Sequence, residues 1–181
     1  MEQIEVVFEH FQIPSKVNLL IQHSKEISDE ICAHSEDPGG IKEFVPADGK
    51  ITWQLLNAVL KQTMLSPQSV FCEWGSGVGL VTLIASFMGM SASGIEIEED
   101  LIDEARSMSR QFGIPATFIH SSIYPIDNPK PLINYHDVDL FFAYPWPNQI
   151  VQMTTLFEQV AASGAILVMY HGGRNYRVFR H

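Results

Sequence analysis

The stretch CEWGSGVGL, residues 72–80, places three glycines within five positions directly after an apolar run. Glu73 stands just before these glycines, which are Gly75, Gly77 and Gly79. A glycine-rich turn after a buried strand lets a cofactor approach the bare backbone closely. The dinucleotide pattern G-x-G-x-x-G would require glycine at position 80, where this chain has leucine. The turn therefore favours a bound cofactor and disfavours an NAD-dependent oxidoreductase.

A second carboxylate, Glu96, ends the next apolar run in GIEIEED, residues 94–100. A carboxylate at the end of the second strand can accept hydrogen bonds from both hydroxyls of a ribose. The acids that follow it are typical of a helix start. The glycine-rich turn and Glu96 together therefore predict a cofactor that contains a ribose.

These residues must be positioned by the elements around them, and from residue 69 onward apolar runs and helical patterns alternate. Five runs are expected to form strands, at residues 69–73, 91–97, 115–120, 137–143 and 164–171. Helical patterns lie between them, at residues 79–88, 98–112 and 148–162. The strands are continuous apolar runs, as burial on both faces of a parallel sheet requires. The sequence predicts an α/β fold with a doubly wound, mostly parallel sheet and helices on both faces.

The two ends of the chain are expected to differ from this core. Residues 1–65 are interpreted as an N-terminal helical segment, or lid, that packs on a cofactor-binding core of residues 66–181. Little chain remains after the fifth strand, so the sheet is expected to be abbreviated at the C-terminus. Its last strand is expected to fold back as an antiparallel edge through a turn at Gly172 and Gly173.

Composition limits the classes of partner. The net charge is −10, and the first fifty residues hold ten acidic against four basic residues, which disfavours a nucleic-acid partner. The chain start lacks the pattern of a secretory signal and no window is apolar enough to cross a bilayer, so no membrane partner is expected. The two cysteines, Cys32 and Cys72, predict neither a disulfide framework nor a zinc site, which fits a reducing cytoplasm. The histidines lack metal-ligand spacing, so no metal is expected.

With these residues in view, the chain resembles the class I S-adenosylmethionine-dependent methyltransferases over about residues 69–170, as a small Rossmann-like member. The stretch EWGSGVG fits the first motif of this family at the acid and at all three glycines. The stretch GIEIEED fits the second motif, with its acid at the end of the second strand. The resemblance implies S-adenosylmethionine as the cofactor.

The resemblance also implies roles for individual residues in cofactor binding. Glu96 would hold the ribose, and Ile97 would pack on the adenine. The glycine-rich turn would border the methionine part, with Glu73 near its amino group. Where the family often has an acid near the adenine amino group, this chain has Ser122, so the Ser122 hydroxyl and the Ile123 backbone are the candidates there. The implied cofactor-binding residues are Glu73, Gly75, Ser76, Gly77, Gly79, Glu96, Ile97, Ser122 and Ile123.

The stretch AYPWP, residues 143–147, follows the fourth strand, where aminomethylating relatives have N/D-P-P-Y/F/W. This chain keeps Pro145 and Trp146 but has Ala143 in place of the leading Asn or Asp, followed by Tyr144. The side chain that orients a base amino group is therefore missing, which disfavours amino methylation of DNA or RNA.

For an amine acceptor, Tyr144, Pro145 and Trp146 are the expected substrate contacts, because an aromatic wall attracts a cation. Tyr144 and His171 are the expected catalytic residues, with His171 as the proton acceptor nearest by topology. The competing interpretations are aromatic packing at the sheet edge for the wall and a turn residue for His171. Glu73 has an alternative too, as a cap for the amides of the following helix.

The predicted function is methyl transfer from S-adenosylmethionine to an unidentified protein or small-molecule acceptor. A protein lysine or a small-molecule amine is slightly preferred, because the stretch FVPADG is similar to one in small protein-lysine methyltransferases. The alternatives are a non-catalytic module that binds S-adenosylmethionine and an RNA base methyltransferase.

Overall fold

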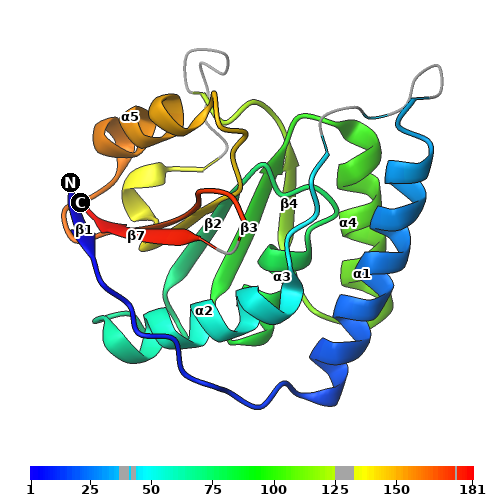
Figure 1. Cartoon of the computed structure of the whole chain (residues 1–181), viewed down its shortest axis with the longest axis horizontal. Helices are drawn as coiled ribbons and strands as arrows, with labels where there is room; N and C mark the ends of the chain where they lie inside the picture. Colours follow the sequence, from blue (N-terminus) through cyan, green and yellow to red (C-terminus); the bar gives the residue numbers. More distant parts are fainter. Residues whose placement is uncertain (37–40, 42–43, 125–132, 174) are drawn as a thin grey trace.

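One seven-stranded sheet organises the chain in the computed structural model, which describes residues 1–36, 41, 44–124, 133–173 and 175–181 (Figure 1). The order of the strands across the sheet is β1-β7-β6-β5-β2-β3-β4. Their bounds are β1 Glu2–Ile4, β2 Val70–Trp74, β3 Ser91–Glu96, β4 Thr117–His120, β5 Leu140–Ala143, β6 Ile166–Tyr170 and β7 Tyr176–Arg180. The helices are α1 Ser15–Ala33, α2 Gly49–Gln62, α3 Leu80–Phe87, α4 Glu99–Phe112 and α5 Ile150–Val160, with a 3-10 turn at Tyr135–Asp137.

The strands β4, β3, β2, β5 and β6 pair in parallel, in that order across the sheet. Connections on both sides of β2 make the sheet doubly wound, as predicted. The carboxyl ends of these strands meet at one edge of the sheet, where ligands bind in open α/β folds.

The C-terminal strand β7 folds back antiparallel to β6, as predicted. The hairpin passes through Gly172 and Gly173, whose φ angles of 97° and 62° are left-handed and favour glycine. The prediction that this strand forms the edge of the sheet was wrong, because β1 pairs antiparallel with β7, with Glu2 opposite Arg180. The three residues of β1 are too few for a visible alternation of apolar and polar residues.

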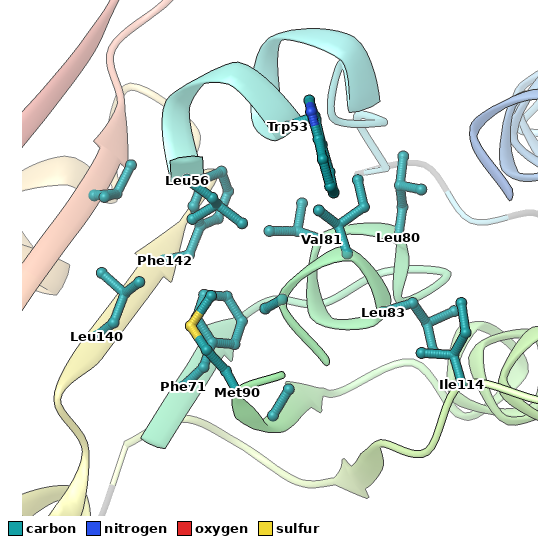
Figure 2. Close-up of a cluster of buried hydrophobic side chains, with 14 of the residues drawn as sticks. Trp53, Leu56, Phe71, Leu80, Val81, Leu83, Met90, Ile114, Leu140 and Phe142 are labelled. Carbon is teal, nitrogen blue, oxygen red and sulfur yellow. The ribbon is translucent and has the colours of Figure 1, made fainter. Parts of the chain in front are cut away.

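Both faces of the sheet are covered, which explains the continuous apolar strands. In β5, Leu140 and Phe142 pack into the core on one face, whereas Phe141 and Ala143 pack into the core on the other. The first core contains side chains of α2, α3 and α4, and Figure 2 shows Trp53 of α2 beside side chains of α3 and the sheet. The second core contains side chains of α5.

The described residues before β2 contact this core at several places. After β1, the extended chain follows α2, where the Gln62 side chain hydrogen-bonds both backbone groups of Val7 and the Gln54 side chain does the same for Phe11. Helix α1 then packs against α3 and α4. The N-terminal segment is thus not only helical, since it adds β1 to the sheet, while the domain boundary near residue 65 stays a prediction.

Candidate functional site

The glycine-rich loop joins β2 to α3 and needs its glycines. The φ angles of Gly75, Gly77 and Gly79 are 73°, 51° and 83°, a region that other residues rarely adopt. An added Cβ at Gly79 would lie 2.7 Å from the Phe118 ring. The loop therefore turns sharply and lies directly against the neighbouring β4.

Backbone hydrogen bonds fix this loop to the end of β3. The N–H groups of Gly75 and Ser76 both donate to the Ile95 carbonyl at 2.9 Å, and the Gly77 N–H donates to Glu96 Oε2 at 2.9 Å. Glu96 Oε1 also accepts from the N–H groups of Ile97 and Glu98, at 2.7 and 3.1 Å. A carboxylate offers about four acceptor positions. Bonds from the described residues thus use three of the positions of Glu96, and among these residues no donor occupies the fourth, on Oε2.

Glu73 lies at the end of β2 and is 3% exposed. It accepts hydrogen bonds from the N–H and the hydroxyl of Thr82, at 2.8 and 2.6 Å, in the first turn of α3. Burial raises its pKa to about 8, although the two bonds from Thr82 oppose the shift. The interpretation of Glu73 as a cap of the following helix is confirmed, and Glu73 is also among the residues that line the cavity described next.

A cavity of about 280 Å³ opens above the loop, close to the lower end of the range of small-molecule pockets, roughly 300–1,000 Å³. It lies at the carboxyl ends of the parallel strands β2, β3, β4 and β5. Most of the residues predicted to bind cofactor or substrate line it: Glu73, Gly75, Ser76, Gly77, Glu96, Ile97, Ser122, Ile123, Tyr144 and Trp146. Gly79, Pro145 and His171 are predicted site residues that do not line it.

The part of the cavity near β3 and β4 is suited to a flat ring. Ile97 is 64% exposed although it follows a buried strand, so its side chain is available for packing. Ser122 and Ile123 follow β4 and line the same cavity. The Ser122 hydroxyl accepts from the Tyr124 N–H at 3.2 Å, and the Ile123 carbonyl accepts from the Tyr135 hydroxyl at 2.9 Å.

An aromatic cluster borders the part of the cavity near β5. Tyr144 stacks on Tyr170 with ring centroids 3.8 Å apart, and Tyr176 lies edge-on to Tyr144 at 6.3 Å. Burial raises the pKa of Tyr144, and the negative charge of Asp48 nearby adds to that shift. Trp146 is 38% exposed beside this cluster. The cavity is thus lined by Tyr144 and Trp146 of AYPWP, and Tyr170 and Tyr176 pack against Tyr144.

His171 is not brought to this wall. Successive side chains of a strand point to opposite faces, and the next residue back, Tyr170, already points to the face of Tyr144. The His171 ring instead lies 6.3 Å from that of Phe179, whose side chain belongs to the core on the α5 face. Burial and the nearby Arg177 lower its pKa. The structure therefore does not bring His171, the expected proton acceptor, to the cavity.

Two groups of lining residues were not predicted. Residues 44–47, which precede α2, pass over the loop, and an added Cβ at Gly77 would lie 2.8 Å from the Phe44 ring. Ser24 and Ser28 line the cavity from α1. Their spacing of four residues, in line with the apolar positions of that helix, is the signal that could have indicated them.

Among the described residues no group of three or more His, Cys, Asp or Glu side chains could hold a metal ion. The described helices include none that is long and apolar enough to cross a bilayer.

A family model described as histone methylation protein DOT1 matches residues 43–119, which include the segment before α2, the loop and Glu96. No curated protein matches the chain.

Several solved structures have the same fold at low sequence identity. An RNA methyltransferase from Salinibacter ruber, in complex with S-adenosyl-L-homocysteine, has a TM-score of 0.59 and 17% identity, over 75% of this chain and 92% of that one. The ribosomal protein L11 methylase from Lactobacillus delbrueckii subsp. bulgaricus has a TM-score of 0.57 and 14% identity, over 72% and 79%. The O-methyltransferase TomG from Streptomyces achromogenes, in complex with SAM, has a TM-score of 0.56 and 14% identity, over 87% and 66%.

These matches confirm the predicted Rossmann-like fold. The family model agrees with the resemblance noted in the sequence over residues 43–119. The three neighbours differ in the acceptors that their descriptions name. The comparisons therefore leave the acceptor open, and they give no support to the expectation that nucleic acid is excluded.

Proposed function

We propose that this chain is a class I S-adenosylmethionine-dependent methyltransferase. We propose further that it methylates an aliphatic amine, either a protein lysine or a small-molecule amine. The observation that carries this proposal is the character of the cavity. Its described lining includes the carboxylates Glu73, Glu96 and Glu98 and an aromatic wall, and contains no Lys, Arg or His. Such a cavity favours cationic ligands over anionic ones.

The residues of the cavity fit the methyl donor. The remaining acceptor position on Glu96 would accept from a ribose hydroxyl, and the exposed Ile97 side chain would pack on the adenine, near Ser122 and Ile123. The glycines of the loop leave room for the amino-acid end, and the Glu73 carboxyl group at the cavity would accept a hydrogen bond from its ammonium. When bound, S-adenosylmethionine would supply a methyl group on a cationic sulfonium. The acceptor would first lose a proton to solvent, and its neutral nitrogen would form the carbon–nitrogen bond as the carbon–sulfur bond breaks and sulfur keeps the electron pair.

The aromatic cluster fits the acceptor. The face of an aromatic ring attracts an ammonium group, and a nearby carboxylate adds to that attraction. Tyr144 and Trp146 supply rings at the cavity, and Asp48 lies close enough to influence the pKa of Tyr144. The carboxylates of the cavity would repel a phosphate-bearing acceptor, and the described lining residues include no cation to bind it.

The task of these residues is to hold the acceptor nitrogen in line with the methyl carbon, because alignment and closeness supply most of the catalysis in such a displacement. The Tyr144 hydroxyl is protonated at neutral pH, as that of an ordinary tyrosine is. Its oxygen can then accept a hydrogen bond from the amine and orient the nitrogen lone pair. His171 has no part in this scheme, since it lies outside the cavity.

A protein acceptor is preferred over a small amine on two grounds. The family model that matches residues 43–119 is described as a histone methylation protein. Trp146 is partly exposed beside the aromatic cluster, where it can contact the chain that carries a lysine.

The test is transfer of tritium from methyl-labelled S-adenosylmethionine to lysine-containing peptides, small aliphatic amines and RNA. We expect label on amine nitrogens, and Tyr144→Ala should lower the rate by roughly tenfold or more, the range of losses seen for positioning groups. The control is Phe8→Ala, an exposed aromatic of the N-terminal segment. Label on RNA alone would support the RNA base methyltransferase instead. Donor binding without transfer to any acceptor would support the non-catalytic module.

A further inference from the structure

Ile97 lines the cavity just beyond the end of a strand. Strand β3 ends at Glu96, whose carbonyl accepts from the Ser121 N–H, the residue after β4, at 2.9 Å. The Ile97 side chain follows and is mostly exposed, so packing against the core does little to hold it. A side chain that is to lie against a flat ring therefore needs another support.

Two side chains hold the backbone of Ile97. Its N–H donates to Glu96 Oε1 at 2.7 Å. Its carbonyl oxygen lies 2.8 Å from Nε2 of His120, the last residue of β4. Because a carbonyl oxygen can only accept, Nε2 of His120 carries a proton and donates it to this bond. Both backbone groups of Ile97 are thus bound by side chains.

The pairing of β3 with β4 explains why His120 can reach Ile97. His120 is the register partner of Glu96, and Ile97 is the next residue beyond that pair. The imidazole thus gives the Ile97 carbonyl the kind of hydrogen bond that the backbone of Ser121 gives the Glu96 carbonyl. His120 is exposed and is not among the residues that line the cavity. It would therefore act on a ligand only through Ile97.

We propose that His120 is a positioning residue for donor binding, which fixes the backbone of Ile97 and thereby keeps the Ile97 side chain in place for the adenine. Hydrogen bonds to the N–H and the carbonyl limit rotation about both soft backbone dihedral angles of a residue. Those angles set the direction in which its side chain points. A side chain that is already in place does not have to be ordered when the ligand binds, so affinity increases. This inference rests on the proposed donor site.

The test is a double-mutant cycle in which S-adenosylhomocysteine is titrated into the wild type, His120→Ala, Ile97→Ala and the double variant. We expect His120→Ala to weaken binding by roughly threefold to tenfold, the range for one lost hydrogen bond. In the Ile97→Ala background the same substitution should change the affinity little, because the side chain through which His120 acts is gone.

A conservative variant and a matched control make the cycle specific. His120→Gln should restore most of the affinity, because glutamine carries an amide N–H donor on a side chain of similar reach. His136→Ala alters an exposed histidine that is not among the lining residues, and it should bind S-adenosylhomocysteine as the wild type does. If His120→Gln bound no better than His120→Ala, the hydrogen bond would not be the cause.

Thermal unfolding of the unliganded variants separates positioning from a structural role. Because His120 is exposed, His120→Ala should change the melting temperature little, and a marked fall would assign His120 to the stability of β4 instead. Equal losses of affinity with and without the Ile97 side chain, or no loss in either background, would overturn the positioning role while leaving the donor site in place. Failure of the wild-type protein to bind S-adenosylhomocysteine would overturn both.

Discussion

Glu73 and Glu96 end neighbouring parallel strands, and each is tied to the backbone that follows it. Glu73 pairs with Thr82 in α3, whereas Glu96 pairs with Gly77 and with the two residues after β3. Both therefore shape the loop before any ligand arrives. Because Glu73 is buried, its ionisation affects the stability of the whole fold.

The stability of the unliganded protein should depend on pH through Glu73. Burial raises its pKa from the ordinary 4.5 to about 8. Because the folded state holds the Glu73 proton more tightly than the unfolded state, the protonated carboxyl group stabilises the fold. This stabilisation is fully present below pH 4.5 and is lost as the pH rises through about 8. We expect the melting temperature of the wild type to fall across this window by several degrees, at roughly 2–4 °C per kcal/mol for a chain of this size.

The variant Glu73→Gln cannot ionise, so its melting temperature should be flatter across the same window. Glu104→Gln, which alters an exposed carboxylate of α4, is the control and should keep the wild-type slope. Parallel curves for the wild type and Glu73→Gln would show that Glu73 does not titrate in this range.

The glycine-rich loop lines the cavity, whereas the extended N-terminal segment leads into α1, which also lines it. The loop gains its shape from left-handed glycines and from the end of β3. The extended segment is attached to α2 by two glutamine side chains that hydrogen-bond its backbone as a neighbouring strand would. Each element suggests a substitution that tests its role.

Gly79→Ala should be more destabilising than Gly164→Ala, although the two glycines have similar φ angles of 83° and 88°. Both substitutions add backbone strain of about 1 kcal/mol or more. Only at Gly79 would the new Cβ also meet a neighbour, 2.7 Å from the Phe118 ring, which adds about 1–3 kcal/mol for overpacking. Urea unfolding measures the loss of free energy of unfolding in each variant. Equal losses would show that β4 shifts to make room for the added methyl group.

Gln54→Ala should loosen the N-terminal segment without unfolding the core. It removes two part-buried hydrogen bonds to Phe11, each worth about 0.5–1.5 kcal/mol. Hydrogen exchange should therefore quicken at the Phe11 amide, while the strands β2 and β5 keep their protection. Gln22→Ala, on the exposed face of α1, should leave exchange at Phe11 unchanged. Unchanged protection in Gln54→Ala would mean that packing alone holds the segment.

At the scale of the whole molecule, the cavity joins segments far apart in the sequence: α1, residues 44–47, the loop and the residue after β5. The apolar strand runs and the glycine spacing are local patterns, so the sequence predicted the parallel sheet, the loop and Glu96 at its edge. Contacts between elements that lie far apart in the sequence were not predictable. The added β1, the stacking of Tyr170 on Tyr144 and the position of Ser28 depend on which elements meet. His171 was misplaced for the same reason, since its face of the sheet depends on the position of β6.

The most direct test of the account is isothermal titration of S-adenosylhomocysteine into the wild type and Glu96→Ala, with NAD as a second ligand. We predict binding of the wild type in the micromolar range, at least about tenfold weaker binding of Glu96→Ala because the ribose loses a charged acceptor, and no binding of NAD. Absence of S-adenosylhomocysteine binding to the wild type, or normal binding to Glu96→Ala, would contradict the donor site described above.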